Sequence, residues 1–448
     1  MRLASESPGH SRRDGSSRSS NCPITRGLLR ASSIRSSSHD RPGPRRFSAT
    51  SSVRPRCAGV RAPASPRTIR ASGSVVATAL LDLFLELCAL PSPPGHERAV
   101  ADRVTRELHA LGLVWDEDGC GAEIGSDIGN LLCRLPATAD EGTPIVFCAH
   151  LDTVPFEGVI EPVVEDGIVR SAGATILGAD NKAAVAVMVE AVRRVVEEGR
   201  PHAGIELLFT PMEEVGLLGA GAFDTRRLAA RVGFVYDQAA PIGEVVVGAP
   251  SAREIVLRFH GQAAHAGMHP EEGRSAIQAA GRAIADFPQG RVDPLSTANV
   301  GVIRGGVARN IIADLCEVQV EARSHDESRL VALVQEILDT AGFAASLSDC
   351  TVEARVEPKY RAYRLQDGDL PVALAVEGLA RAGVRATTAL SGGAADANVL
   401  NEHGLPCVNL ANGMAEIHTT DEWIAAADLE RMVDVTLGIV DAARLHRR

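Results

Sequence analysis

Two short motifs in the first half of the chain carry side chains that can bind a metal ion or move a proton. His150 and Asp152 follow the apolar run 145–149. A neutral imidazole binds zinc well, and a carboxylate beside its second nitrogen fixes the tautomer and orientation of the ring. Glu213 and Glu214 follow a second apolar run. In such a pair, one carboxylate can bind metal while the other accepts a proton from the attacking water. Each motif alone also has a plainer interpretation. His150 can be a strand-end histidine capped by Asp152, and Glu213 and Glu214 can form a solvated acidic turn.

Three more polar side chains stand in comparable positions. Asp180 opens an expected helix, Asp237 directly follows an apolar run, and His418 lies in the segment 416–423. A carboxylate at the position of Asp180 can bridge two cations. The alternatives are an ordinary helix cap for Asp180, a strand-end cap for Asp237 and a surface histidine for His418.

The elements that carry these side chains follow from the apolar patterns. Runs 145–149, 205–210 and 232–236 are typical of strands buried on both faces. Residues 76–91, 96–112 and 183–196 show helical patterns. This alternation predicts an α/β fold with a mostly parallel sheet and helices on both faces. Open α/β sheets place their sites at the carboxyl ends of strands, so we expect the polar side chains to meet there.

The pattern changes near Ala249. Expected strands at 255–260, 298–304 and 315–322 alternate with expected helices at 274–287 and 327–341. We therefore predict an inserted, smaller α+β lid or dimerisation domain at 250–359. It would divide a catalytic domain into a first part at 75–249 and a second part at 360–448.

The charge is distributed unevenly along the chain. The formal net charge is -11, yet residues 1–70 contain 15 arginines and only 3 acidic residues, so the remainder is strongly acidic. Because contact with phosphates needs Lys and Arg, this composition argues against a nucleic-acid partner. Residues 1–74 are rich in Ser, Arg and Pro and lack a core-forming pattern, which predicts a disordered tail. An organellar targeting segment and a start codon placed too far upstream are the alternatives.

The cysteines and the hydropathy pattern indicate where in the cell the protein is expected. The nine cysteines are scattered and form no C-x-x-C pair, which favours a reducing compartment and a cytoplasmic location. No apolar run reaches the roughly 18 residues of a membrane span, so no membrane partner is expected.

Together, and in this order, the motifs resemble those of the two-zinc exopeptidases. This family includes tripeptidase T, dipeptidases, glutamate carboxypeptidase and succinyl-diaminopimelate desuccinylase. The resemblance covers residues 76–445 and is nearest to the peptidase T-like group, because Asp237 stands where the desuccinylase and glutamate carboxypeptidase carry Glu. It implies the two-zinc exopeptidase fold and two Zn²⁺ ions per chain, with Co²⁺ or Mn²⁺ as substitutes.

The resemblance also implies the metal ligands. Asp180 would bridge both ions and would be followed by a cis peptide bond. His150 and Asp237 would complete one site, and Glu214 and His418 the other.

Further roles are implied for residues around these ligands. Glu213 would be the general base, and Asp152 would orient His150. His265 resembles a lid histidine that reaches into the partner subunit's site and stabilises the oxyanion, so a homodimer is one implied assembly. His269 is a weaker match to the same position.

Further residues are implied to bind substrate. Asn310 and Arg323 match lid positions that bind substrate in relatives, and the Arg323 guanidinium can hold a carboxylate by two points. Gly392 resembles the family's glycine-rich loop near the substrate. The alternative for Arg323 is a pair with an acid on its own strand. Asp396 receives no role.

These roles imply a zinc metallopeptidase that acts on short peptides, as an aminopeptidase or tripeptidase. One alternative is an amidohydrolase of the same family acting on N-acyl or carbamoyl amino acids. The other is a metal-binding relative without catalysis, which the full set of ligand types and Glu213 argue against.

Overall fold

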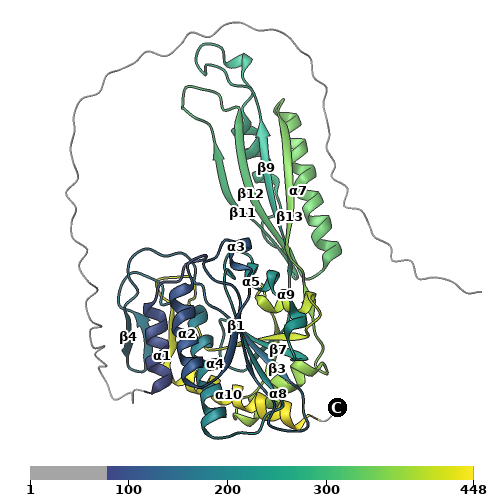
Figure 1. Ribbon diagram of the computed structural model, residues 1–448. Coiled ribbons are helices and arrows are strands. Elements are labelled where there is room, and N and C mark those ends of the chain that lie inside the picture. The colour runs from purple at the N-terminus through teal and green to yellow at the C-terminus, as the bar shows by residue number, and fades with distance from the viewer. Residues whose placement is uncertain (1–77, 447–448) are drawn as a thin grey trace, which may run out of the picture. The chain divides into compact units, whose positions relative to one another are not determined.

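The computed structural model describes residues 78–446. The predicted tail at 1–74 lies outside this range. Within this range, the chain forms a large β-sheet covered by helices, a separate sheet-rich lobe and a small three-stranded sheet (Figure 1). No helix among the described residues is long and apolar enough to cross a bilayer. The seven cysteines of this part of the chain are all free and buried.

The large sheet has the strand order β1-β2-β6-β3-β7-β16-β8-β14, and β15 pairs with β8. Its centre is parallel, because β3 pairs in parallel with β6 and β7, and β7 pairs in parallel with β16. Antiparallel pairs occur toward the edges, for example between β1 and β2. The strands are β1 (Val114–Glu117), β2 (Leu131–Leu135), β3 (Ile145–His150), β6 (Ile205–Thr210), β7 (Val232–Gln238), β8 (Glu244–Ala249), β14 (Tyr363–Arg364), β15 (Thr387–Leu390) and β16 (Cys407–Ala411).

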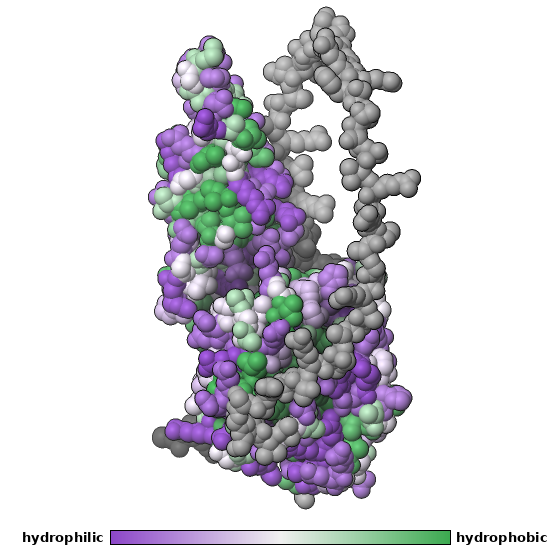
Figure 2. Space-filling view, turned by 90° about the vertical axis from the view of Figure 1, so that its left-hand side faces the viewer, coloured by the Kyte–Doolittle hydropathy of each residue, from purple (hydrophilic) through white to green (hydrophobic). Residues whose placement is uncertain are grey.

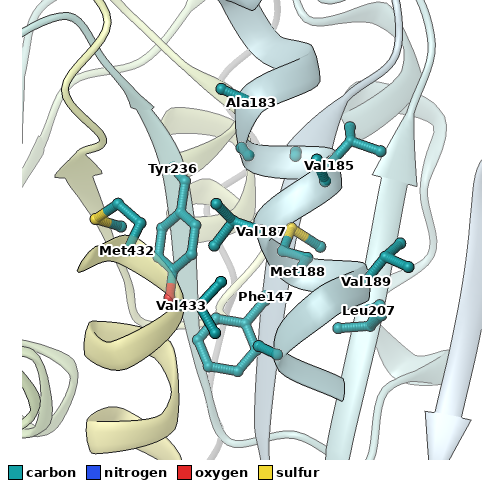
Figure 3. Close-up of a cluster of buried hydrophobic side chains, with 14 of the residues drawn as sticks. Phe147, Ala183, Val185, Val187, Met188, Val189, Leu207, Tyr236, Met432 and Val433 are labelled. Carbon is teal, nitrogen blue, oxygen red and sulfur yellow. The ribbon is translucent and has the colours of Figure 1, made fainter. Parts of the chain in front are cut away.

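Both faces of this sheet are buried, which explains why its central strands are mostly apolar. Along β3, Phe147 packs into one core while Val146 and Cys148 pack into a second core on the other face. In Figure 3, Phe147 and Tyr236 lie beside Val187. The Phe147 and Tyr236 ring centroids are 5.6 Å apart. The predicted α/β fold is therefore confirmed.

Helices cover the sheet and carry apolar side chains toward it. The side chains of α1, α2, α4, α8 and α10 join the first core, whereas α9 contributes to the second. Thr78 caps α1 by accepting a hydrogen bond from the Leu81 N–H at 3.2 Å, which satisfies a free donor at the helix start. The helices are α1 (Ala79–Ala89), α2 (Arg98–Ala110), α3 (Gly121–Ile124), α4 (Ala179–Glu197), α5 (Leu218–Ala222), α8 (Leu370–Arg381), α9 (Asp396–Glu402) and α10 (Ala426–Leu445).

The sheet-rich lobe is an antiparallel sheet with the order β10-β11-β12-β9-β13, and two helices pack against it. Burial alternates along β12, as expected for a sheet with one covered face. Figure 1 shows α7 running along this sheet. The elements are β9 (Ser251–His260), α6 (Ala276–Asp286), β10 (Gly290–Asp293), β11 (Ser296–Gly305), β12 (Leu315–Ser324), α7 (Glu327–Leu347) and β13 (Thr351–Tyr360). The exact division of the chain into domains stays a prediction.

Some strands were not predicted from the sequence. β13 is mostly exposed, and its apolar residues alternate with charged ones, so it shows no continuous apolar run. The small sheet joins β4 (Pro162–Glu165) and β5 (Ile168–Ser171) to the distant β17 (Trp423–Ala425).

Candidate metal and active site

The candidate ligands lie at the carboxyl ends of the central strands or in loops beside them. His150 is the last residue of β3, and Asp237 lies at the end of β7. Glu213 and Glu214 follow β6, and Asp180 lies at the start of α4. Parallel neighbours bring the strand ends to one edge of the sheet. His418, between β16 and β17, completes the set.

Asp180 lies between two groups of potential ligands. Its Oδ1 is 3.2 Å from His150 Nε2, which is 3.6 Å from Asp237 Oδ1. Its Oδ2 is 3.1 Å from His418 Nε2, which is 3.0 Å from Glu214 Oε1. Within each group, one donor atom per residue lies within 4.8 Å of the others. The two groups are the ones that the resemblance implied. The peptide bond between Asp180 and Asn181 is cis, as expected.

The site concentrates negative charge away from water. Burial, together with the neighbouring Asp180 carboxylate, raises the pKa of Asp237 to about 8. Burial also raises the pKa of Glu213 well above its usual range, with Asp237 adding to the effect. Hydrogen bonds to Asp180 and Glu214 raise the pKa of His418 to about 10. Buried carboxylates crowded beside two histidines form a site that a cation would stabilise, and mixed N and O donors suit zinc.

Asp152 contacts both His150 and the paired acids. His150 Nδ1 donates to the Asp152 carbonyl oxygen at 2.9 Å, and its distance to the carboxylate is 3.4 Å. This bond places a proton on Nδ1, so Nε2 would be the nitrogen that binds a metal ion. The Asp152 carboxylate accepts the backbone N–H groups of Glu213 and Glu214, each at 3.0 Å. The sequence did not indicate this second contact.

A cavity of about 550 Å³ opens over these groups. The sheet-rich lobe contributes Glu321, Arg323, Lys359 and Tyr360 to its lining. Arg323 Nε donates to Glu321 at 2.6 Å and Nη2 donates to the same carboxylate at 3.1 Å, which is the own-strand pair considered above. Arg323 Nη1 donates to the Gly392 carbonyl at 3.3 Å, so two of the three predicted substrate-binding residues are in contact. Arg323 lines the cavity, and Gly392 lies between its lining residues Ser391 and Gly393.

Two predicted site residues are not brought to this cavity. His265 and Asn310 lie side by side in the sheet-rich lobe, where the Ala266 N–H donates to the Asn310 carbonyl at 3.0 Å. His265 Nδ1 accepts the N–H groups of Gly267 and Met268. Neither His265 nor Asn310 lines the cavity that contains Glu213 in this chain.

Sequence reasoning missed the buried acid Glu97 near the ligands and left a second one, Asp396, without a role. Glu97 accepts the Met212 N–H at 3.2 Å, directly before the paired acids. Asp396 accepts a hydrogen bond from the Thr210 hydroxyl at 2.5 Å. Neither acid belongs to a ligand-like pattern, and only their burial reveals them.

Comparison with known proteins agrees with this geometry. A model of peptidase family M20/M25/M40 matches residues 146–442. A solved tripeptidase from Staphylococcus aureus subsp. aureus Mu50 is 36% identical, with 82% of this chain and 98% of that chain covered and a TM-score of 0.78. Aminopeptidase PepT from Bacillus cereus ATCC 10987 is 38% identical, with 81% and 98% covered and a TM-score of 0.74. Peptidase T of Vibrio cholerae is 25% identical over 405 residues, which are 80% of this chain and 94% of that relative.

These similarities confirm the resemblance that the motifs indicated. The family match covers more than half of the chain, and both solved relatives are matched over nearly their whole length. The chain therefore belongs to peptidase family M20/M25/M40, in its peptidase T-like group, and is a hydrolase that acts on peptide bonds.

Proposed function

We propose that the protein is a two-zinc aminopeptidase or tripeptidase that hydrolyses short peptides. The observation that carries the proposal is the position of Asp180, whose two carboxylate oxygens face separate groups of N and O donors. His150 and Asp237 would hold one ion with Asp180, and Glu214 and His418 the other. Zinc fits this donor set, and Co²⁺ or Mn²⁺ can replace it. When bound, such a pair of cations polarises the scissile carbonyl and lowers the pKa of the attacking water.

Glu213 would move the proton during hydrolysis. Its carboxylate would accept a proton from the attacking water as the new C–O bond forms, and would return it to the leaving nitrogen as the C–N bond breaks. Burial and the neighbouring carboxylates raise the pKa of Glu213, so its carboxylate binds a proton more readily than an exposed glutamate does. Asp152 would hold the paired acids in place through their backbone N–H groups.

The proposed substrate follows from the relatives and the cavity. The two solved relatives are described as a tripeptidase and an aminopeptidase, which supports short peptides as substrates. N-acyl or carbamoyl amino acids are the alternative substrates. Arg323 lines the cavity and would bind their carboxylate in place of the Glu321 carboxylate that it contacts in this structure. Asn310, Arg323 and Gly392 keep their proposed role in substrate binding.

His265 would act on the site of a partner subunit, because it does not line the cavity of its own chain. Apolar surface supports a homodimer formed through the sheet-rich lobe. Figure 2 shows a hydrophobic patch on this lobe. Exposed apolar side chains of the lobe include Ile277, Ile303 and Val307.

One experiment tests the activity and the metal together. Purified protein is assayed for metal content and for turnover of a tripeptide panel and an N-acyl-amino-acid panel. We expect up to two zinc ions per chain and faster release of N-terminal residues from tripeptides. Faster turnover of the acylated substrates would instead favour the amidohydrolase, and metal content without turnover of either panel would favour a non-catalytic relative.

A further inference from the structure

The loop at 416–422 contacts Asp180 in two different ways. His418 Nε2 lies 3.1 Å from the Asp180 side-chain Oδ2. Four residues later, Glu422 Oε1 accepts the backbone N–H of Asp180 at 3.0 Å. Glu422 Oε2 accepts the N–H groups of Leu177 and Gly178, both at 2.8 Å. One carboxylate therefore holds three donors of the turn that presents Asp180.

Glu422 is only 2% exposed, so these hydrogen bonds decide whether its carboxylate can be buried there. An ionised group in the interior is costly unless donors replace its lost hydration. Three backbone N–H groups do so here, and hydrogen bonds to an ionised acceptor are stronger than bonds between neutral groups. The contact therefore restrains the turn from Leu177 to Asp180.

The loop itself is closed at its base. Ala415 forms an antiparallel bridge with Trp423, which begins β17. The Thr419 hydroxyl donates to the Glu416 carbonyl at 2.7 Å, and the Asp421 N–H donates to the Thr419 hydroxyl at 3.1 Å. These contacts fix the spacing between His418 and Glu422 and thus couple the loop to the Asp180 turn.

We propose that Glu422 is a positioning residue that aims the Asp180 carboxylate at both ligand groups. The inference rests on the proposed function, because it concerns the metal ions proposed for that site. Groups that orient metal ligands in this way contribute about 10–100-fold to metal affinity or activity. Loss of the Glu422 contact should therefore weaken metal binding without removing any ligand.

Glu422→Gln tests the inference at constant side-chain size. Glutamine has one accepting oxygen, so its NH₂ group must face at least one of the three N–H donors. Glu206→Gln is the matched control. Glu206 is 4% exposed and accepts the Ala230 N–H at 2.8 Å, but it belongs to neither ligand group. Zinc affinity is measured by competition with a chelating dye, the Co²⁺ absorption spectrum reports ligand geometry, and melting temperature is measured after chelation.

We expect about 10–100-fold weaker zinc binding and an altered Co²⁺ spectrum in Glu422→Gln. Glu206→Gln should lower the melting temperature while keeping wild-type zinc affinity. If Glu422→Gln does not fold, Glu422→Asp is tested instead. Its side chain is one methylene shorter, so the carboxylate lies farther from the three N–H donors, and the same loss of zinc affinity is expected. Wild-type zinc affinity and an unchanged Co²⁺ spectrum in the folded variant would overturn this inference alone. A wild-type chain that binds no metal would overturn the proposed function as well.

Discussion

Replacing Glu213 with glutamine should remove the proton acceptor while preserving the fold and the metal ligands. The two side chains have nearly the same size, and the Glu213 N–H keeps its bond to the Asp152 carboxylate. General-base catalysis contributes about 10²–10⁴-fold to the rate, which is about 2.7–5.4 kcal/mol of activation free energy. Glu213 is only 8% exposed, so bulk water replaces the lost base poorly. We therefore expect kcat to fall by about 10³–10⁴-fold, in the upper half of this range.

The assay compares kcat and KM for a tripeptide, metal content and melting temperature. Glu214→Gln is the natural control, because Glu214 lies 3.0 Å from His418 in a ligand group and its replacement should weaken metal binding instead. Loss of metal from Glu213→Gln, with metal retained in Glu214→Gln, would show that the two roles are reversed. A kcat within about tenfold of wild type in metal-loaded Glu213→Gln would refute the general-base role.

Four further outcomes are expected. Chelation should abolish hydrolysis and zinc should restore it, so full activity in demonstrably metal-free protein would contradict the metal site. Asp152→Asn should lower kcat by about 10–100-fold, because an amide NH₂ would face the N–H of Glu213 or Glu214; unchanged kinetics would exclude this contact from catalysis. Chains with His265→Ala and chains with Glu213→Gln, each nearly inactive alone, should regain about a quarter of wild-type activity when mixed equally under subunit exchange, because half of the dimers are mixed and each has one intact site. A monomeric mass in solution at full activity would refute that shared site. Phe147→Ala should lower the free energy of unfolding by about 3–5 kcal/mol, measured by denaturant titration, because the ring is buried against Phe234 and Tyr236.

The central strands could be predicted from the sequence because their burial depends on a simple local pattern. β3, β6 and β7 are buried on both faces along nearly their whole length, so most of their side chains are apolar, with Glu206 as an exception inside β6. Polar residues directly after such runs must emerge at one edge of a parallel sheet. The order of these residues along the chain was therefore enough to indicate the family and the candidate ligands.

The edge strand β13 was not predicted, because it contains no continuous apolar run. β13 pairs with β9 at the edge of its sheet, and most of its side chains are exposed. Its sequence alternates Val352, Ala354 and Val356 with charged residues, a period-two pattern that a search for continuous apolar runs does not detect. Its pairing with β9 identifies it as a strand.

The residue types of the site were determined by the sequence alone, whereas the contacts that hold them depend on the tertiary structure. Asp152 holds the N–H groups of residues 61 and 62 positions away, and Glu422 holds the N–H of Asp180 across 242 positions. The hydrogen bond from Arg323 to the Gly392 carbonyl, across 69 positions, likewise depends on the tertiary structure. Local patterns report which face of an element is buried. Which distant backbone donor meets a buried carboxylate depends on how the whole chain returns to the same edge of the sheet.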